Sequence, residues 1–125
     1  MSHEELNIDI KTERSGESII FRLRGALDIA TSPTIRAALL EEVTEHRHKV
    51  VVDLTQLNFL DSTGLGALIG AQRRALERGG EHLRLVVTEG PISRLLNITG
   101  LMEVFAVYPS VETALNGENR VPATL

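Results

Sequence analysis

The sequence contains no cysteine and no tryptophan, and these absences exclude several kinds of site. Without cysteine, the chain can form no disulfide, thiol nucleophile or cysteine-ligated zinc site. Aromatic residues make up only 3% of the 125 residues, so few side chains could stack on the bases of single-stranded nucleic acid. Basic residues are not in excess either, because the net charge is −4. The chain therefore lacks the electrostatic footprint of a protein that binds DNA or RNA.

Long hydrophobic runs are also missing, and this bears on where the protein works. No apolar run is long enough to span a bilayer, and the polar start of the chain does not resemble a signal peptide. We therefore expect a cytoplasmic protein. The length predicts a single domain, and the hydrophobic content of 42% is enough for a core of aliphatic residues. We expect this domain to cover residues 1–116 and residues 117–125 to form a frayed tail.

Hydrophobic periodicity predicts an α/β fold. Residues 6–11 and 19–24 alternate between apolar and polar types, so we expect a hairpin of two strands that each face water on one side. The later elements are expected to be a helix from Ser32, as its N-cap, to near His46, a strand at 50–54, a helix at 62–78, a strand at 83–87, a short helix from Pro91, a strand at 104–107 and a helix from Ser110 to Leu115. This order predicts a mixed sheet of about five strands, with parallel crossovers in its second half, and about four helices.

The segment Asp61-Ser62-Thr63-Gly64-Leu65-Gly66 is the most informative part of the chain. It follows a bridge that carries Leu57, Phe59 and Leu60, and it opens the helix at 62–78. We expect Ser62 to be the N-cap of that helix. The first backbone N–H groups of a helix have no intrahelical partner and the helix dipole favours negative charge there, so a phosphate on Ser62 would be tolerated. The alternative is that Ser62 is only a cap, whose removal costs about 1 kcal/mol.

Three separated segments together resemble the STAS domain of the anti-sigma factor antagonist family. They are the run from Leu23 to Asp28, the strand Val51–Leu54 followed by Asp61–Gly66, and Thr99-Gly100-Leu101 with Phe105 beyond it. The resemblance covers nearly the whole chain, from about Leu6 to Leu115. It implies a mixed sheet with helices mainly on one face.

The same resemblance implies a switch. The family's serine, matched by Ser62, is phosphorylated by an anti-sigma factor that has a histidine-kinase-like fold but acts on serine. The unphosphorylated form binds this partner and releases a sigma factor, and a serine phosphatase resets the switch. Many members have a second serine after the first, and here that position is Thr63, which leaves a second hydroxyl.

The helix predicted at 62–78 has two faces of different composition. Its larger apolar residues are expected to face the core; these are Leu65, Leu68, Ile69 and Leu76. Its small residues are then expected on or beside the outer face; these are Gly66, Ala67, Gly70 and Ala71. Each glycine costs about 1 kcal/mol in a helix relative to alanine, and close approach by another chain could offset this cost. The alternative is that the glycines pack against another element of the same domain.

Two further charged positions are candidates for the same interface. Arg73 could form a rim that contacts acidic groups of a partner, or it could simply be solvated. Asp28 could orient the Ser62 hydroxyl or receive a cation of the partner, or it could be a turn residue. The residues that we expect to contact a partner are Asp28, Asp61, Thr63, Gly64, Gly66, Ala67, Gly70 and Arg73.

No pattern in the sequence indicates catalysis. His46 and His48 are two residues apart and do not share a helical face, and the histidines and carboxylates form no metal-ligand pattern. Neither a Gly-x-Ser-x-Gly nucleophile motif nor a phosphate-binding Gly-Lys-Ser/Thr motif is found. We therefore expect neither enzyme activity, nor a metal, nor a cofactor, and Ser62 would be a substrate. Two other functions remain open: a STAS adaptor subunit of a membrane transport complex, and a nucleotide or small-ligand sensor that uses the helix mouth as a phosphate site.

Overall fold

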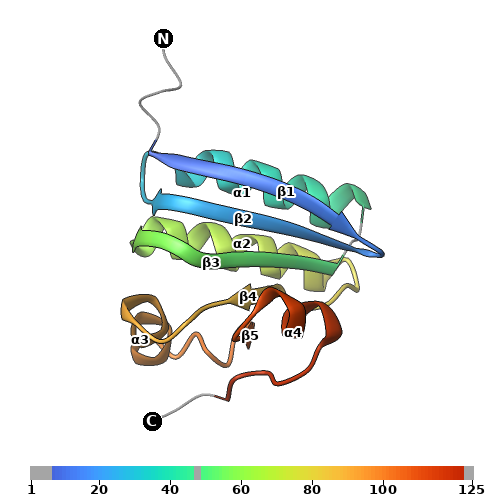
Figure 1. Ribbon diagram of the computed structural model, residues 1–125. Helices are drawn as coiled ribbons and strands as arrows, with labels where there is room; N and C mark the ends of the chain where they lie inside the picture. The colour runs from blue at the N-terminus through green and yellow to red at the C-terminus, as the bar shows by residue number, and fades with distance from the viewer. Residues whose placement is uncertain (1–6, 47–48, 123–125) are drawn as a thin grey trace.

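Five strands and four helices follow one another in the expected order. The computed structural model describes residues 7–46 and 49–122 (Figure 1). The strands are β1 (Ile8–Ser15), β2 (Ser18–Leu27), β3 (Lys49–Leu60), β4 (Arg84–Val86) and β5 (Ala106–Tyr108). The helices are α1 (Ser32–Glu41), which continues into a π-helical turn η2 (Glu42–His46), α2 (Ser62–Glu77), α3 (Pro91–Ile98) and α4 (Val111–Asn116).

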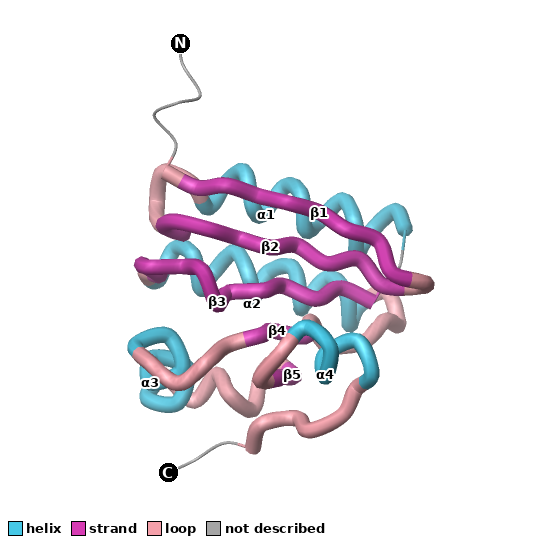
Figure 2. The backbone as a smooth tube through the Cα atoms, in the orientation of Figure 1, coloured by secondary structure: helices cyan, strands magenta, loops and turns pink. Residues whose placement is uncertain are grey.

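The strands form one mixed sheet in the order β1-β2-β3-β4-β5 (Figure 2). The first two strands pair in an antiparallel hairpin, which turns at Gly16, and every later pair is parallel. Antiparallel neighbours can be joined by a tight turn, whereas each parallel step needs a crossover, and here a helix supplies it. The predicted hairpin followed by parallel strands is confirmed.

Most of the helices cover one face of the sheet. In Figure 1, α1 and α2 lie behind the sheet and α4 lies in front of it. The main core lies under α1, α2 and α3, and its fully buried side chains include Leu39, Leu68 and Leu96. A smaller core lies under α4 and contains Ile20, Val51, Val86, Ala106, Tyr108 and Ala114. The expectation of helices mainly on one face is confirmed.

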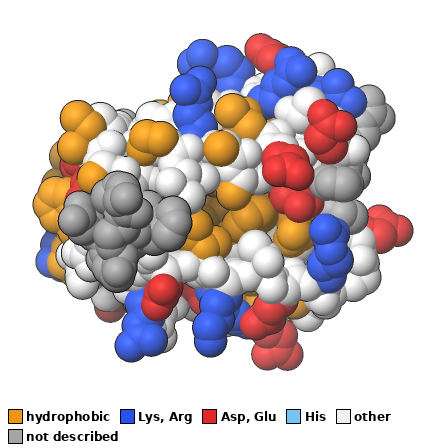
Figure 3. Space-filling model, turned by 90° about the horizontal axis from the view of Figure 1, so that it is seen from above, with side chains coloured by type: hydrophobic (Ala, Val, Ile, Leu, Met, Phe, Trp, Pro, Cys, Tyr) orange, Lys and Arg blue, Asp and Glu red, His pale blue; other side chains and the backbone are white. Residues whose placement is uncertain are grey.

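The edge of the sheet at β1 remains partly open to solvent. Ile8 and Ile10 of β1 and Ala38 and Leu40 of α1 are only partly buried against the main core. Viewed from this side, the molecule shows hydrophobic side chains in the middle and charged side chains around them (Figure 3). The alternation seen in the sequence thus gives β1 one apolar face toward the helices and one polar face, as expected for an edge strand.

Strand β2 departs from the expected pattern in its first half. The sequence predicts one face toward water, and Arg24 is indeed exposed. Ile20, on the same side of the strand, is instead buried at 3% exposure in the small core under α4. Strand β2 is therefore covered on both faces in its first half, where α4 lies over it, and on one face in its second half.

Strand β3 is much longer than the predicted strand at 50–54. Two bulges interrupt the alternation of its side chains, so the sequence pattern indicates only the first part of the strand. Asp53 lies opposite Arg22, and Gln56 lies opposite Arg24, so three steps along β3 match two along β2. A second shift follows after Gly25. A bulge inserts one unpaired residue and moves the following side chains to the other face. The residues from Leu57 to Leu60, expected to be a bridge, are therefore part of the strand.

Several element ends differ from the prediction by one or two residues. The N-cap of α1 is Thr31 rather than Ser32, and Pro33 lies in the first turn, where its missing N–H costs no hydrogen bond. Strand β5 lies slightly later than the predicted strand at 104–107. In the segment expected to form the tail, the N–H of Val121 donates to the carbonyl of Val107 at 2.7 Å.

Candidate functional site

The candidate site lies where β3 ends and α2 begins, beside the end of β2. The N–H of Asp61 donates to the carbonyl of Leu27 at 3.3 Å, so the two strand ends are joined directly. Gly64 packs into this junction. A Cβ atom at Gly64 would lie 2.6 Å from the carbonyl oxygen of Leu27 and 2.8 Å from Cδ1 of Leu60. Only a glycine lets the first turn of α2 approach both strands this closely.

The N-cap of α2 is Asp61, and the expected N-cap role of Ser62 is therefore wrong. Asp61 has extended backbone angles, and its carboxylate accepts the N–H of Gly64 at 3.0 Å. The same carboxylate oxygen accepts the hydroxyl of Thr63 at 2.6 Å. The hydroxyl of Thr63 and then the N–H of Gly64 stabilise the charged form, so they lower the pKa of Asp61. Ser62 is the first residue of the helix proper.

The two neighbouring hydroxyls differ in what they bond. Both Ser62 and Thr63 are exposed. The Thr63 hydroxyl donates to Asp61, whereas the Ser62 hydroxyl makes no hydrogen bond to any other residue within 7–46 and 49–122. Because its neighbour supplies the cap, Ser62 presents an uncommitted hydroxyl beside the unpaired N–H groups of a helix start. The structure therefore distinguishes two side chains that the sequence alone leaves equivalent.

Asp28 occupies the turn between β2 and α1. Its carboxylate accepts the N–H groups of Ala30 at 2.9 Å and Thr31 at 3.0 Å. These bonds match the turn-residue alternative for Asp28. Within the described part of the chain, Asp28 makes no hydrogen bond to Ser62, so the structure gives no sign that it orients this hydroxyl.

The outer face of α2 carries the two glycines but not the two alanines. Gly66 is exposed, and a Cβ atom there would meet nothing within 4 Å. A Cβ at Gly70 would meet only the side chain of Arg36, at 3.8 Å. Among the described residues, Gly66 therefore has no packing contact that requires a glycine. Arg73 is exposed on the same helix.

The expected outer position of Ala67 and Ala71 is wrong. They are 4% and 0% exposed, whereas Leu76, expected in the core, is 42% exposed. The buried stripe contains Leu65 and Leu68 as predicted, but it continues through Ala71 and Ala75 rather than through Leu76. Alanine is small enough to let a helix lie close to a sheet. A prediction of the buried face that uses only the largest apolar residues therefore misses the alanines.

Two exposed hydrophobic residues near this helix start are not evident from the sequence. Ile29 follows Asp28 and is 73% exposed, and Phe59 lies two residues before Asp61 and is 50% exposed. Phe59 belongs to the segment expected to be a bridge, and it lies in β3 next to its last residue, Leu60; Ile29 lies two residues after the end of β2. The signal that could find them is their place within two residues of an aspartate at which the chain leaves the sheet.

The groups present at the site are an exposed hydroxyl and a carboxylate. Among residues 7–46 and 49–122, no group of three or more His, Asp or Glu side chains could hold a metal ion. None of the helices in this part of the chain is both long and apolar enough to cross a membrane. The arrangement offers an exposed hydroxyl, a helix start that tolerates negative charge and a neighbouring carboxylate.

Comparisons with known proteins identify the family of the chain. The family model of the STAS domain matches residues 9–114. The chain is 35% identical to the anti-sigma-B factor antagonist of Listeria monocytogenes, over 91% of this chain and 97% of that protein, and 32% identical to the anti-sigma F factor antagonist of Paenibacillus polymyxa, over 88% and 94%. A crystal structure of an anti-sigma factor antagonist from Mycobacterium paratuberculosis superposes with a TM-score of 0.78 at 25% identity, covering 88% of this chain and 92% of that one. The chain belongs to the STAS-domain family of anti-sigma factor antagonists.

Proposed function

We propose that this protein is an anti-sigma factor antagonist in which phosphorylation of Ser62 switches partner binding off. The unphosphorylated form binds an anti-sigma factor that has a histidine-kinase-like serine kinase fold, and this binding releases a sigma factor. The names of the relatives support an anti-sigma factor as the partner. The observation that carries the switch is the exposed Ser62 hydroxyl, which has no hydrogen-bond partner in the described part of the chain.

The choice of Ser62 over Thr63 is supported by their different hydrogen bonds. A kinase must reach the hydroxyl oxygen and remove its proton during transfer. The proton of Thr63 is already donated to Asp61 at 2.6 Å, and that bond is part of the cap of α2. Modifying Thr63 would break the bond and place a phosphate against a carboxylate. Modifying Ser62 disturbs no hydrogen bond between described residues.

A phosphate on Ser62 would act on the partner more than on the fold. It adds about −1.5 to −2 charges at neutral pH. The start of α2 favours negative charge, so the domain stays folded. The carboxylate of Asp61 is next in the chain, and the two anions together form a concentrated negative patch. A partner surface that fits a neutral hydroxyl would then bury an unpaired charge, and several kcal/mol of binding energy, or about a thousandfold in affinity, is lost.

The expected footprint of the partner extends along α2. Gly66 leaves the helix backbone open to another chain, because nothing lies within 4 Å of its missing Cβ. The exposed side chains of Ile29 and Phe59 lie at the strand ends that adjoin the start of α2 and add hydrophobic area. Exposed apolar residues grouped beside a polar centre are typical of protein interaction sites. We therefore expect Thr63, Gly66 and Gly70, with Arg73 at the rim, to lie in the interface. Gly64, expected there from the sequence, is buried against Leu27 and Leu60 and holds the start of α2 close to the strands instead.

Phosphosite mapping with purified proteins tests the switch. The wild-type protein and the Ser62→Ala and Thr63→Val variants are incubated with ATP and each anti-sigma factor kinase encoded by the source organism. We expect phosphate on Ser62 in the wild-type and Thr63→Val proteins and none in Ser62→Ala. A phosphate on Thr63, or no transfer from any of these kinases, would contradict the proposal. A purified serine phosphatase should remove the phosphate and restore binding.

Binding measurements test the repulsion mechanism separately. Ser62→Ala should change the free energy of unfolding by no more than about 0.5 kcal/mol, as for an ordinary surface substitution, and should bind the anti-sigma factor constitutively. Ser62→Asp and Ser62→Glu should bind more weakly. If the folded Ser62→Ala protein failed to bind, the hydroxyl itself would be required and charge repulsion would be the wrong account.

A further inference from the structure

A polar groove lies on the face of the sheet opposite α1 and α2. It consists of two adjoining depressions, with volumes of about 350 Å³ and 300 Å³, that share Asp9, Arg24 and Gln56. The first depression is also lined by Asn7, Gly25 and Asn58, and the second by Lys11, Arg22 and Asp53. Volumes of this order correspond to the small end of metabolite-binding pockets.

The groove exists because α4 covers only half of this face of the sheet. Under α4 the face is apolar and carries Ile20 and Val51. Beyond α4, the same side of β2 and β3 carries Arg24, Gln56 and Asn58. The bulge between Asp53 and Gln56 brings about this arrangement, because it turns Gln56 and Asn58 to the side that Val51 occupies earlier in the strand. Bulges that redirect side chains in this way are frequent next to binding sites.

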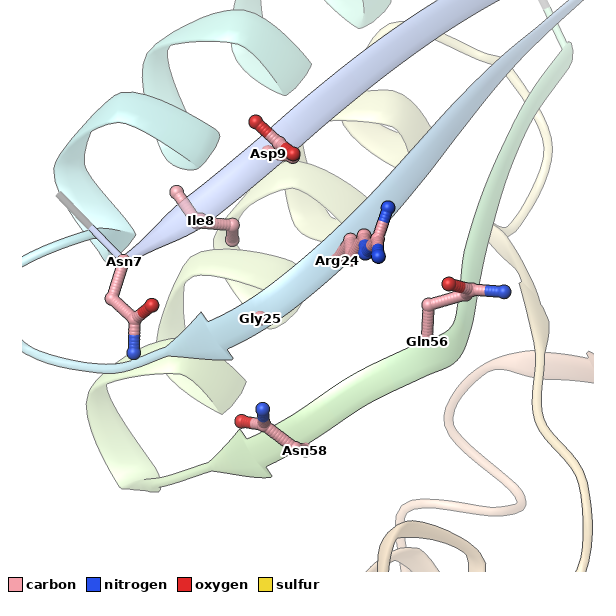
Figure 4. A pocket seen from close by; sticks show the side chains of 7 residues that line it. All are labelled: Asn7, Ile8, Asp9, Arg24, Gly25, Gln56 and Asn58. Carbon is pink, nitrogen blue, oxygen red and sulfur yellow. The ribbon is translucent and has the colours of Figure 1, made fainter. Parts of the chain in front are cut away.

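Arg24 and Asp9 lie at the centre of the groove with opposite charges. They are directly opposite each other on β2 and β1. Figure 4 shows them with Gln56 and Asn58 around the depression, which is floored at Gly25. Neither Arg24 nor Asp9 forms an ion pair or a side-chain hydrogen bond with another residue of the described chain. The neighbouring Arg22 behaves differently, since it pairs with Glu13 and Asp53, each at 3.1 Å.

The amides beside these charges are also uncommitted. The side chains of Gln56 and Asn58 make no hydrogen bond to the described residues. Each amide has both a donor and an acceptor, so each can bind a ligand group of either kind. One surface about the size of a small metabolite thus offers a cation, an anion and two amides that are not used within the fold.

We propose that this groove binds a free α-amino acid with a polar side chain. The guanidinium of Arg24 binds the ligand's carboxylate, a pairing that is often bidentate. The carboxylate of Asp9 binds its ammonium group, and the amides of Gln56 and Asn58 bind its side chain. A zwitterion fits because both charges are present side by side and unpaired, whereas a simple anion would leave Asp9 facing it. The proposal does not depend on the switch at Ser62.

Nuclear magnetic resonance titration of the whole protein with L-glutamine tests this binding. We expect amide shifts concentrated at residues 9, 24, 56 and 58 that saturate at millimolar ligand. Two analogues test the zwitterion: glutaramic acid lacks the amine, and 4-aminobutanamide lacks the carboxylate. Each should bind about tenfold more weakly, since each loses one charge-assisted contact.

Surface variants complete the test. Arg24→Gln and Asp9→Asn should each weaken L-glutamine binding by about tenfold. Arg94→Gln, which removes an exposed cation on α3, should leave it unchanged, and the dispersion of the amide spectrum verifies that each variant is folded. The proposal is overturned if millimolar L-glutamine causes no saturable shift, if either analogue binds as well as L-glutamine, or if Arg94→Gln weakens binding as much as Arg24→Gln.

Discussion

Helices α1 and α2 begin in similar ways at the same end of the sheet, but they expose their hydroxyl groups differently. Each follows a Leu-Asp pair at the end of a strand, Asp28 after β2 and Asp61 after β3. In each, the aspartate side chain accepts at least one backbone N–H, and the hydroxyl oxygen of a nearby threonine lies within hydrogen-bond distance of the carboxylate. Thr31 in the first start is 0% exposed, whereas Ser62 in the second is exposed.

The difference between the two starts separates structural hydroxyls from a reachable one. The hydroxyl of Thr31 donates to the carbonyl of Ala26 at 2.8 Å and accepts the N–H of Asp28 at 2.9 Å, so it satisfies two backbone groups inside the domain. At the start of α2 the Ser62 hydroxyl bonds no backbone group of the described residues, because the N–H of Gly64 and the carboxylate of Asp61 form the cap without it. A hydroxyl at a helix start is therefore a candidate for modification only where the cap is complete without it.

The largest expected effect concerns the closeness of α2 to the sheet. Gly64→Ala places a Cβ within 3 Å of a backbone carbonyl oxygen and a leucine side chain, so we expect a loss of about 3 kcal/mol in the free energy of unfolding. Gly66→Ala, two residues further along the same helix, meets open space. It should instead stabilise the protein by about 1 kcal/mol, since alanine is the better helix former. Urea denaturation of both variants measures the difference.

This pair of glycines also separates folding from binding. If Gly66 is left open for a partner, Gly66→Ala should weaken binding to the anti-sigma factor while the fold becomes more stable. Equal stability of the Gly64→Ala and Gly66→Ala proteins would mean that α2 does not approach the strand ends as closely as described.

The second prediction compares the two threonines. Thr31→Val removes the hydroxyl from a buried site and leaves the carbonyl of Ala26 and the N–H of Asp28 without that partner, so we expect a loss of about 2 kcal/mol. Thr63→Val removes an exposed hydroxyl and should cost no more than about 0.5 kcal/mol. Thermal unfolding at neutral pH measures both. If Thr63→Val lost as much stability as Thr31→Val, the two helix starts would not differ in how far their threonine hydroxyls support the fold.

The order of the elements could be predicted from the sequence because it depends on local signals. Alternation defined the hairpin, and the turn and capping residues defined where α2, α3 and α4 begin to within a residue. The cap of α2 could not be assigned, because Asp61 and Ser62 are both good N-cap residues and only the backbone decides between them. In the structure, Asp61 is extended, and its side chain accepts a helical N–H.

Features that depend on contacts between strands could not be predicted. The bulges in β3 break the alternation after Asp53, and a broken alternation resembles a loop in the sequence although the pairing with β2 continues. The groove requires Asp9, Arg24 and Gln56 to lie side by side, and only the register of three strands brings them together. The reachable hydroxyl could be named from the sequence, but its difference from Thr63 depends on a hydrogen bond that periodicity does not reveal.

The smallest expected difference between the two helix starts is electrostatic. The Thr63 hydroxyl is the main cause of the lowered pKa of Asp61. A carboxyl whose pKa is lower in the folded state contributes stability above its unfolded pKa of about 3.9, and this stability is lost as the pH falls through the folded pKa. We therefore expect the stability of the wild-type protein, relative to Asp61→Asn, to decline as the pH falls through this acidic range. Asparagine is a suitable matched control because it can cap the helix but does not titrate there.

Thr63→Val tests the assigned cause directly. With the hydroxyl gone, the pKa of Asp61 should move back toward its ordinary value, while the N–H of Gly64 still lowers it in part. Carboxyl carbon shifts followed by nuclear magnetic resonance across the acidic range measure this pKa, and Ser62→Ala is the matched control because the Ser62 hydroxyl is not bonded to Asp61. An unchanged pKa in Thr63→Val would mean that the Thr63 hydroxyl is not held by Asp61 and is as available as that of Ser62, and the structural basis for choosing between the two hydroxyls would then be lost.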